Sequence, residues 1–222
     1  MKVILFGATG MVGQGVLREC LLDSGVERVL SIVRHPAAHQ DPKLQELVLQ
    51  DFLDYAPVEG QLSGYDACFF CLGVTSAGMA ETAYRRITYD ITMAAARALS
   101  RLNPGMTFVY VSGMGTDSSE RAPVMWARVK GETENALQQL PFHAVYLFRP
   151  AMIVPEHGIR SKTALYQFFY SALAPLLPFL RNAWPKYITT TSRLGRAMLR
   201  VARSGAPQPV LENADIDVLG RE

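Results

Sequence analysis

The segment Phe6-Gly7-Ala8-Thr9-Gly10-Met11-Val12-Gly13 decides the fold, because its glycines stand between an apolar run at residues 2–6 and a helical pattern at residues 11–22. Gly7 permits a tight turn, Gly10 lets the backbone approach a pyrophosphate, and Gly13 lets the helix pack closely on the strand. Unpaired N–H groups at the helix start then bind the anion. Glycine-rich turns also occur where a chain only has to bend, but this context predicts a dinucleotide loop. Its expected contact residues are Gly7, Thr9, Gly10, Met11, Val12 and Gly13.

Strand and helix patterns alternate along most of the remaining chain. Short apolar, β-branched runs followed by helical stretches are typical of repeated βαβ units. We therefore expect a Rossmann-type α/β fold, a doubly wound parallel sheet with helices on both faces. The predicted strands are residues 2–6, 28–33, 46–50, 67–71, 107–111 and 144–148; the predicted helices are residues 11–22, a short one near Asp54, and residues 81–102, 124–140 and 192–203.

The composition excludes several classes of protein. The chain of 222 residues has 22 Lys plus Arg against 20 Asp plus Glu, a net charge of +2, and no block of like charges. Binding to nucleic acid needs many cations to displace counterions from phosphates, so we expect no nucleic-acid partner. With 49% apolar and 19% charged residues, the chain can bury a full hydrophobic core, which excludes a disordered protein. Apolar residues in excess of the core would lie on the protein surface.

The cysteines and histidines indicate a reducing compartment and no metal site. Three cysteines are too few for a disulfide scaffold, and the first residues lack the apolar stretch of a secretory signal, so we expect a cytoplasmic protein. Cys68 and Cys71 have the spacing of a redox or metal pair, but inside a strand they point to opposite faces. The four histidines show no metal-ligand spacing.

The last third of the chain differs from the rest. We treat residues 1–222 as one domain in which residues 151–222 form a small, mostly helical substrate or lid region. Residues 163–180 carry no charge and are long enough for a membrane span, but Pro175 and Pro178 shorten any helix there. We favour a helix packed against the domain or against a second subunit of a homodimer; a membrane-surface contact and a membrane span are the alternatives.

The glycine spacing resembles the extended or atypical branch of the short-chain dehydrogenase/reductase superfamily, whose members include NAD-dependent epimerases and dehydratases. The resemblance covers residues 2–152, and it is nearest to the NADPH-binding oxidoreductase family of the Tat-interacting protein TIP30. The matching blocks are Phe6-Gly7-Ala8-Thr9-Gly10, Cys71-Leu72-Gly73, Val111-Ser112-Gly113, Val129-Lys130-Gly131-Glu132 and Phe148-Arg149-Pro150.

The residues after the second predicted strand favour NADP(H) over NAD(H). A carboxylate there would bind the ribose hydroxyl of NAD, whereas this chain has Arg34 and His35. A guanidinium offers a fork of donors that matches the extra phosphate of NADP and can stack on adenine. The alternative is an arginine that is merely solvated in a loop.

The resemblance implies further cofactor contacts. Asp51 and Phe52 match the pair beside the adenine, although Asp51 could simply cap the short helix that follows. The remaining positions match the loop over the adenosine ribose, the segment that lines the nicotinamide and the closing part of the site. They are Cys71, Leu72 and Gly73, then Arg149, Pro150, Ala151 (usually Gly in the family) and Met152, and finally Ile153 and Arg160.

The catalytic positions of the superfamily are only partly matched. Its working set is a Ser or Thr, a Tyr, and a Lys four residues after the Tyr, where the Lys lowers the pKa of the phenol that donates the proton. Ser112 and Lys130 fit, but Trp126 stands at the tyrosine position. An indole cannot relay a proton. Trp126 would be a stacking platform beside the nicotinamide or a packing residue. Other candidate donors are Tyr84, Tyr89, Tyr166 and Tyr170.

Two functions fit these residues. The first is an NADP-dependent oxidoreductase or epimerase-like enzyme that acts on a small, unidentified substrate. The second is a non-catalytic, NADPH-binding protein that senses redox state or engages a protein partner.

Overall fold

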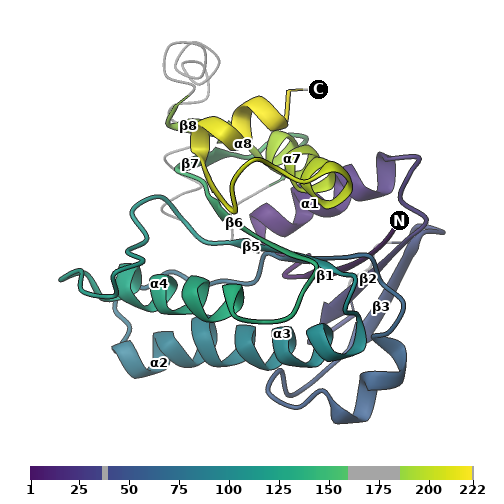
Figure 1. Ribbon diagram of the computed structural model, residues 1–222. Coiled ribbons are helices and arrows are strands. Elements are labelled where there is room, and N and C mark those ends of the chain that lie inside the picture. Colours follow the sequence, from purple (N-terminus) through teal and green to yellow (C-terminus); the bar gives the residue numbers. More distant parts are fainter. Residues whose placement is uncertain (37–39, 160–185, 222) are drawn as a thin grey trace.

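The computed structural model describes residues 1–36, 40–159 and 186–221 (Figure 1). Its centre is a seven-stranded sheet in which every neighbouring pair is parallel, in the order β3-β2-β1-β4-β5-β6-β9. This arrangement confirms the doubly wound Rossmann fold. The strands are β1 (Lys2–Phe6), β2 (Arg28–Val33), β3 (Leu44–Val48), β4 (Ala67–Phe70), β5 (Thr107–Val111), β6 (Ala144–Arg149) and β9 (Val210–Glu212); β7 (Met152–Val154) and β8 (Ile188–Thr190) form a separate pair.

Helices cover both faces of the sheet, as Figure 1 shows. One face carries α1 (Met11–Leu22), α7 (Thr191–Ser204) and α8 (Asn213–Leu219). The other carries α2 (Glu81–Arg85), the π-helical turn η2 (Arg86–Asp90), α3 (Ile91–Leu102) and α4 (Met125–Gln138), and a 3-10 helix, η1 (Ala56–Gln61), precedes β4. Each face has its own apolar core, as expected when a sheet is buried on both sides.

The register of the central strands sets the position of the site. Phe6, the last residue of β1, pairs with Ile32 of β2 and with Phe70 of β4. The loops that follow these three strands therefore begin side by side at the carboxyl edge of the sheet. In open α/β sheets this edge is where ligands bind.

The differences from the predicted elements are local. The strand expected at residues 46–50 begins at Leu44, where a turn that starts at Asp41 ends: the Asp41 carboxylate accepts from the Lys43 N–H at 2.8 Å, and its carbonyl accepts from the Leu44 N–H at 3.0 Å. The predicted helix at residues 81–102 contains the π-helical turn η2. β7, β8 and β9 were not predicted, since strands of three residues are too short to show a period. The seven-residue α8 was not predicted either.

The C-terminal part contributes to the main domain. β9 pairs with β6 at the sheet edge, and α7 packs so closely on α1 that a Cβ on Gly15 would lie 2.4 Å from the Thr191 Cβ. The apolar run at residues 163–180 and Arg160 lie outside the described residues. In the part of the chain that the structure describes, no helix has both the length and the apolar character that crossing a membrane requires.

Candidate functional site

The glycine loop has the geometry that its sequence predicts. Gly7 has φ 79°, and a Cβ there would lie 2.7 Å from the Cys71 carbonyl carbon. A Cβ on Gly13 would lie 2.0 Å from the Gly7 carbonyl oxygen, so only glycine lets α1 start this close to β1. A Cβ on Gly10 would meet only the Gly7 oxygen, at 3.4 Å. The backbone at Gly10 is therefore open to a ligand.

The start of α1 suits an anion. Its N-cap, Gly10, has no side chain to accept hydrogen bonds from the first turn, and that turn contains no acidic residue. The free N–H groups and the positive end of the helix dipole are therefore left for a ligand. This is the observation on which a pyrophosphate fits the loop.

A cleft of about 540 Å³ opens beside this loop at the carboxyl ends of β1, β2 and β4. We call it the glycine-loop half of the site. It brings together nine of the predicted cofactor residues and misses others, among them Met11, Val12, Gly13 and Asp51. Its lining residues are Gly7, Ala8, Thr9, Gly10, Ile32, Val33, Arg34, His35, Pro36, Phe52, Cys71, Leu72, Gly73, Val74, Ile87 and Ile91.

Charge in the glycine-loop half is positive. No Asp or Glu lines the cleft, and within the described residues the Arg34 guanidinium forms no ion pair. The Arg34 carbonyl accepts from the Gln50 amide at 3.1 Å, which ties the end of β2 to the chain after β3. Asp51 instead turns to its own loop, where its carboxylate accepts from the Leu53 N–H at 2.9 Å.

Seven residues of this cleft were not predicted as cofactor contacts, and two of them come from helices. Ile87 lies in the π-helical turn and Ile91 begins α3, and both line the cleft. Two apolar residues four positions apart predict one buried helix face, but they do not predict that this face lines a ligand cleft. A π-helical turn inserts a residue and changes which side chains share a face, and no residue pattern in this stretch indicates it.

A second group of residues lies at the end of β5: the predicted Ser112, Trp126 and Lys130, and Thr116, which was not predicted. We call these four residues the lysine cluster. The Lys130 Nζ donates to the Ser112 carbonyl at 3.1 Å, and the hydroxyls of Ser112 and Thr116 are 2.8 Å apart. Thr116 also donates to the Gly113 carbonyl at 2.8 Å, so the Ser112 hydroxyl is the donor to Thr116. The cluster thus joins the first residue after β5 to the middle of α4.

Gly131 explains how α4 reaches this loop. A Cβ at this position would lie 1.8 Å from the Asp117 carbonyl oxygen, so the residue next to Lys130 has to be glycine. Asp117 fixes the loop in turn: its carboxylate accepts from the Ser119 hydroxyl at 2.7 Å and from the N–H groups of Ser119, Arg121 and Ala122, and these hydrogen bonds lower its pKa to about 2. The Asp117 N–H donates to the Ala127 carbonyl at 3.1 Å, which ties the loop to α4.

The electrostatics of Lys130 are unusual. Its Nζ lies 5.5 Å from the centre of the Tyr110 ring, and burial lowers its pKa to about 8, while Glu134 opposes that shift. Glu134 is buried and forms an ion pair with Arg149. The guanidinium of Arg149, a predicted nicotinamide contact, is therefore directed toward Glu134 of α4, and it also donates to the hydroxyl of Ser118, in the loop before α4, at 2.6 Å.

Trp126 is partly buried, and its ring lies against Gly115: a Cβ added to Gly115 would lie 3.3 Å from the Trp126 Cη2 atom. The tyrosines that were the other candidate proton donors lie in different surroundings. Tyr84 is 2% exposed and burial raises its pKa, whereas Arg85 stacks over the Tyr89 ring at 4.2 Å. Tyr166 and Tyr170 lie outside the described residues.

The predicted segment after β6 is held by backbone contacts. The Pro150 carbonyl accepts from the Met114 N–H at 2.9 Å, and the Ala151 N–H donates to the Asn213 side chain at 3.0 Å. The Met152 N–H donates to the Tyr187 carbonyl at 3.0 Å, and Ile153 pairs with Thr189 in the β7–β8 ladder. These contacts bring the segment next to the lysine cluster, because Met114 follows Ser112 by two residues.

The cysteines contribute no disulfide. Cys68 packs into the core on the α3 side of the sheet and Cys71 against the core on the α1 side, and both are free thiols whose pKa is raised by burial. Cys71 lies on the cleft wall. Among the described residues, no group of three or more His, Cys, Asp or Glu side chains could hold a metal ion.

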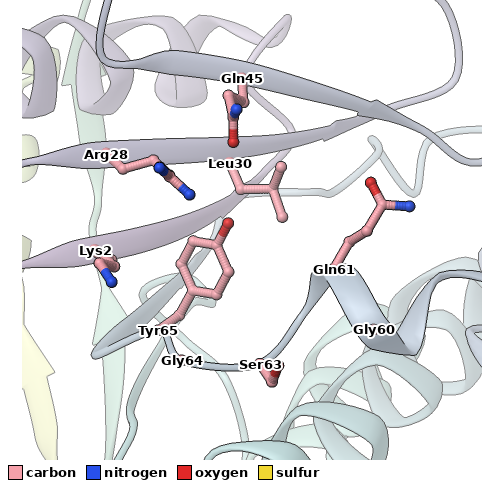
Figure 2. A pocket seen from close by; sticks show the side chains of 9 residues that line it. All are labelled: Lys2, Arg28, Leu30, Gln45, Gly60, Gln61, Ser63, Gly64 and Tyr65. Atoms are coloured by element: carbon pink, nitrogen blue, oxygen red, sulfur yellow. The ribbon is translucent and has the colours of Figure 1, made fainter.

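A second, smaller pocket of about 290 Å³ lies at the opposite, amino-terminal edge of the sheet (Figure 2). Figure 2 shows the Tyr65 ring pointing toward the Arg28 guanidinium, with Lys2 at the start of β1 beside them. The length of the strands separates this pocket from the glycine loop, so it is not part of the site.

A family model described as NAD(P)H-binding matches residues 7–145, more than half of the chain. The chain belongs to this NAD(P)H-binding family. The match includes the glycine-loop half and the lysine cluster, and together with the relatives below it confirms the resemblance to the short-chain dehydrogenase/reductase superfamily.

Curated relatives and solved structures agree with this assignment. Protein fmp52 of Emericella nidulans, named as mitochondrial, is 30% identical, with 82% of this chain and 80% of that protein covered. Protein HTATIP2 of Rattus norvegicus is 27% identical, with 100% and 90% covered. The structure of Gre2 from Candida albicans, in complex with NADPH, matches with a TM-score of 0.72 at 14% identity over 96% of this chain and 78% of that one, a likeness that concerns the fold alone.

These relatives correct one expectation. The cysteine count and the absence of a secretory signal predicted a cytoplasmic protein, whereas several fungal relatives are named as mitochondrial. The prediction was wrong because its premises exclude only the secretory route. Few cysteines indicate a reducing environment and do not distinguish one such compartment from another.

Proposed function

We propose that this protein is an NADPH-dependent oxidoreductase that reduces a carbonyl group on a small apolar substrate. The NAD(P)H-binding family supplies the coarse function. The cofactor preference and the reaction are argued from the chain's own residues.

The observation that carries the proposal is the charge pattern at the end of β2. Arg34 lines the cleft without a carboxylate partner in the described chain, and neither it nor His35 has an acidic neighbour on the cleft wall. A carboxylate at this point would repel the 2′-phosphate of NADPH, whereas a free guanidinium binds it with two parallel hydrogen bonds. This pattern favours NADPH over NADH.

Different residues of the described chain would bind different parts of the cofactor. The first-turn N–H groups of α1 would bind the pyrophosphate, and Phe52, Ile87 and Ile91 offer an apolar wall for the adenine. Lys130 would bind the ribose hydroxyls on the nicotinamide side. When bound, the reduced dinucleotide supplies a hydride. The Ser112 hydroxyl would then turn its O–H from Thr116 to the substrate carbonyl, while Thr116 donates to the Ser112 oxygen.

An apolar substrate is suggested by the surface next to the lysine cluster. Met114, Met152 and Tyr187 are 37%, 42% and 49% exposed. The backbone bonds from Met114 to Pro150 and from Met152 to Tyr187 tie their three segments together. Exposed apolar side chains gathered beside a polar cluster are typical of a binding surface.

Titration calorimetry tests the cofactor preference. We expect NADPH to bind at least about tenfold more tightly than NADH, and Arg34→Ala to remove most of that difference while leaving the affinity for NADH nearly unchanged. Arg97→Ala, an exposed arginine on α3 that does not line the cleft, is the matched control and should change neither affinity. Equal affinities of the native protein for the two cofactors would refute the preference.

A non-catalytic, NADPH-binding regulator is the second candidate, and Trp126 is the observation that favours it. An indole at the position of the superfamily's phenol removes the usual proton donor. The two functions differ in turnover: the enzyme oxidises NADPH in the presence of aldehydes, ketones or ortho-quinones, whereas the regulator binds NADPH and leaves all of them unreduced.

A further inference from the structure

Among the described residues, the lysine cluster contains no phenol to donate the proton that carbonyl reduction needs. Trp126 cannot donate a proton from its indole at neutral pH, and the hydroxyls of Ser112 and Thr116 do not ionise there. Tyr110 is 1% exposed and Tyr84 is 2% exposed, and burial raises the pKa of both phenols. Each of these groups is therefore a poor acid for the reaction.

Lys130 is the remaining ionisable group of the cluster. Its Nζ donates one hydrogen bond, to the Ser112 carbonyl at 3.1 Å, and this carbonyl is the only hydrogen-bond partner of the ammonium among the described residues. An ammonium has three N–H donors, so two are left for ligands. Since Ser112 is the residue expected to orient the substrate carbonyl, the proposed function would place the reacting group beside these protons.

We propose that Lys130 is itself the proton donor, and that its ammonium protonates the oxygen of a substrate carbonyl held at Ser112. This rests on the proposed function, which supplies the reductant. A hydride forms a new C–H bond at the carbonyl carbon, and the π electron pair moves to the oxygen. That oxygen takes a proton from Nζ, the N–H electrons stay on nitrogen, and water returns a proton to the neutral amine.

The surroundings of Lys130 suit this role. Burial lowers its pKa to about 8, so the ammonium gives up its proton far more readily than an ordinary lysine with a pKa near 10.5. The groups that face it are Glu134 from its own helix, the Tyr110 ring from β5 and the Ser112 carbonyl. Arg149 from β6 pairs with Glu134, and Arg85 from α2 pairs with Glu132, so both nearby carboxylates of α4 are neutralised.

Chemical labelling of the full chain tests the state of Lys130 without any turnover. Acetic anhydride reacts with neutral amines, and peptide mass spectrometry measures the labelled fraction at each lysine from pH 6 to 11. We expect labelling of Lys130 to be half-maximal near pH 8 and to fall several-fold when NADP⁺ is added. Lys43 is the matched control, because its Nζ also donates to backbone carbonyls, of Leu21 and Asp23, away from the cleft. NADP⁺ should not change its labelling.

Variants test the proton transfer itself. Lys130→Arg keeps the positive charge, but a guanidinium does not release its proton near neutral pH. We expect NADPH binding within about threefold of native and a turnover rate about 100-fold lower or less. Adding Trp126→Tyr to this variant supplies a phenol and should return part of the rate, which a purely structural role for Lys130 would not allow. Lys43→Arg is the control and should keep the native rate.

The outcomes separate this proposal from the proposed function. Native turnover and an unchanged pH profile in Lys130→Arg would overturn Lys130 as the donor and leave the oxidoreductase standing. Labelling of Lys130 only above about pH 10, or labelling that NADP⁺ does not reduce, would likewise overturn Lys130 as the donor. A native protein that binds NADPH but reduces no carbonyl compound would overturn both.

Discussion

The glycine-loop half of the site and the lysine cluster share one packing feature and differ in their chemistry. In each, a helix glycine lies against a loop carbonyl: Gly13 against Gly7, and Gly131 against Asp117. The glycine-loop half then follows the family pattern, with free N–H groups and a cation for phosphates. The lysine cluster contains Trp126 at the position where the superfamily resemblance predicts a phenol. Binding and catalysis can therefore change separately in this chain.

The largest expected effect is in the glycine-loop half. A methyl group from Gly13→Ala would lie 2.0 Å from the Gly7 carbonyl oxygen and would push α1 away from the loop. We expect NADPH binding, measured by calorimetry, to weaken about 100-fold or more, and thermal unfolding to show a loss of about 1–3 kcal/mol.

Gly60→Ala is the control for this change, because a Cβ there meets nothing within 4 Å. It should leave both measurements unchanged. If Gly13→Ala binds NADPH as the native protein does, the loop does not hold the pyrophosphate.

Gly131→Ala tests whether the lysine cluster is independent of the glycine-loop half. The added Cβ would clash with the Asp117 carbonyl at 1.8 Å and displace the loop that carries Ser112 and Thr116. We expect a similar loss of stability, about 1–3 kcal/mol, and loss of turnover. NADPH should bind about tenfold more weakly. Adenosine 2′,5′-bisphosphate, which lacks the nicotinamide, should bind as tightly as to the native protein, and weaker binding of this fragment would show that the two halves are coupled.

The residues of the glycine-loop half and those of the lysine cluster could be predicted from the sequence on different grounds. Gly7, Gly10 and Arg34 could be placed because backbone freedom and the end of a parallel strand fix what they face. Ser112 and Lys130 meet as the superfamily's spacing implies. The positions that lie outside the described residues, such as Arg160, remain predictions.

Other features depend on contacts that no local pattern encodes. The π-helical turn places Ile87 on the cleft wall, and the sequence has no proline or glycine there to indicate it. Arg149 turns away toward Glu134, a buried carboxylate 15 positions earlier on another element, because an unpaired charge in that core would be costly. Such pairings are decided by tertiary packing, which periodicity does not report.

The smallest expected effect comes from Thr116, which accepts the Ser112 hydroxyl and donates to the Gly113 carbonyl. Thr116→Val keeps the shape and removes one hydrogen bond to each neighbour, so unfolding should show a loss of about 1 kcal/mol. NADPH binding should not change, because Thr116 does not line the glycine-loop half. With its partner gone, the Ser112 hydroxyl loses its fixed orientation, and we expect a higher KM for the carbonyl substrate at nearly constant affinity for NADPH. Thr116→Ser, which keeps the hydroxyl, should preserve the native KM. An equal rise in KM for both variants would show that the methyl group of Thr116, and not its hydrogen bond, positions Ser112.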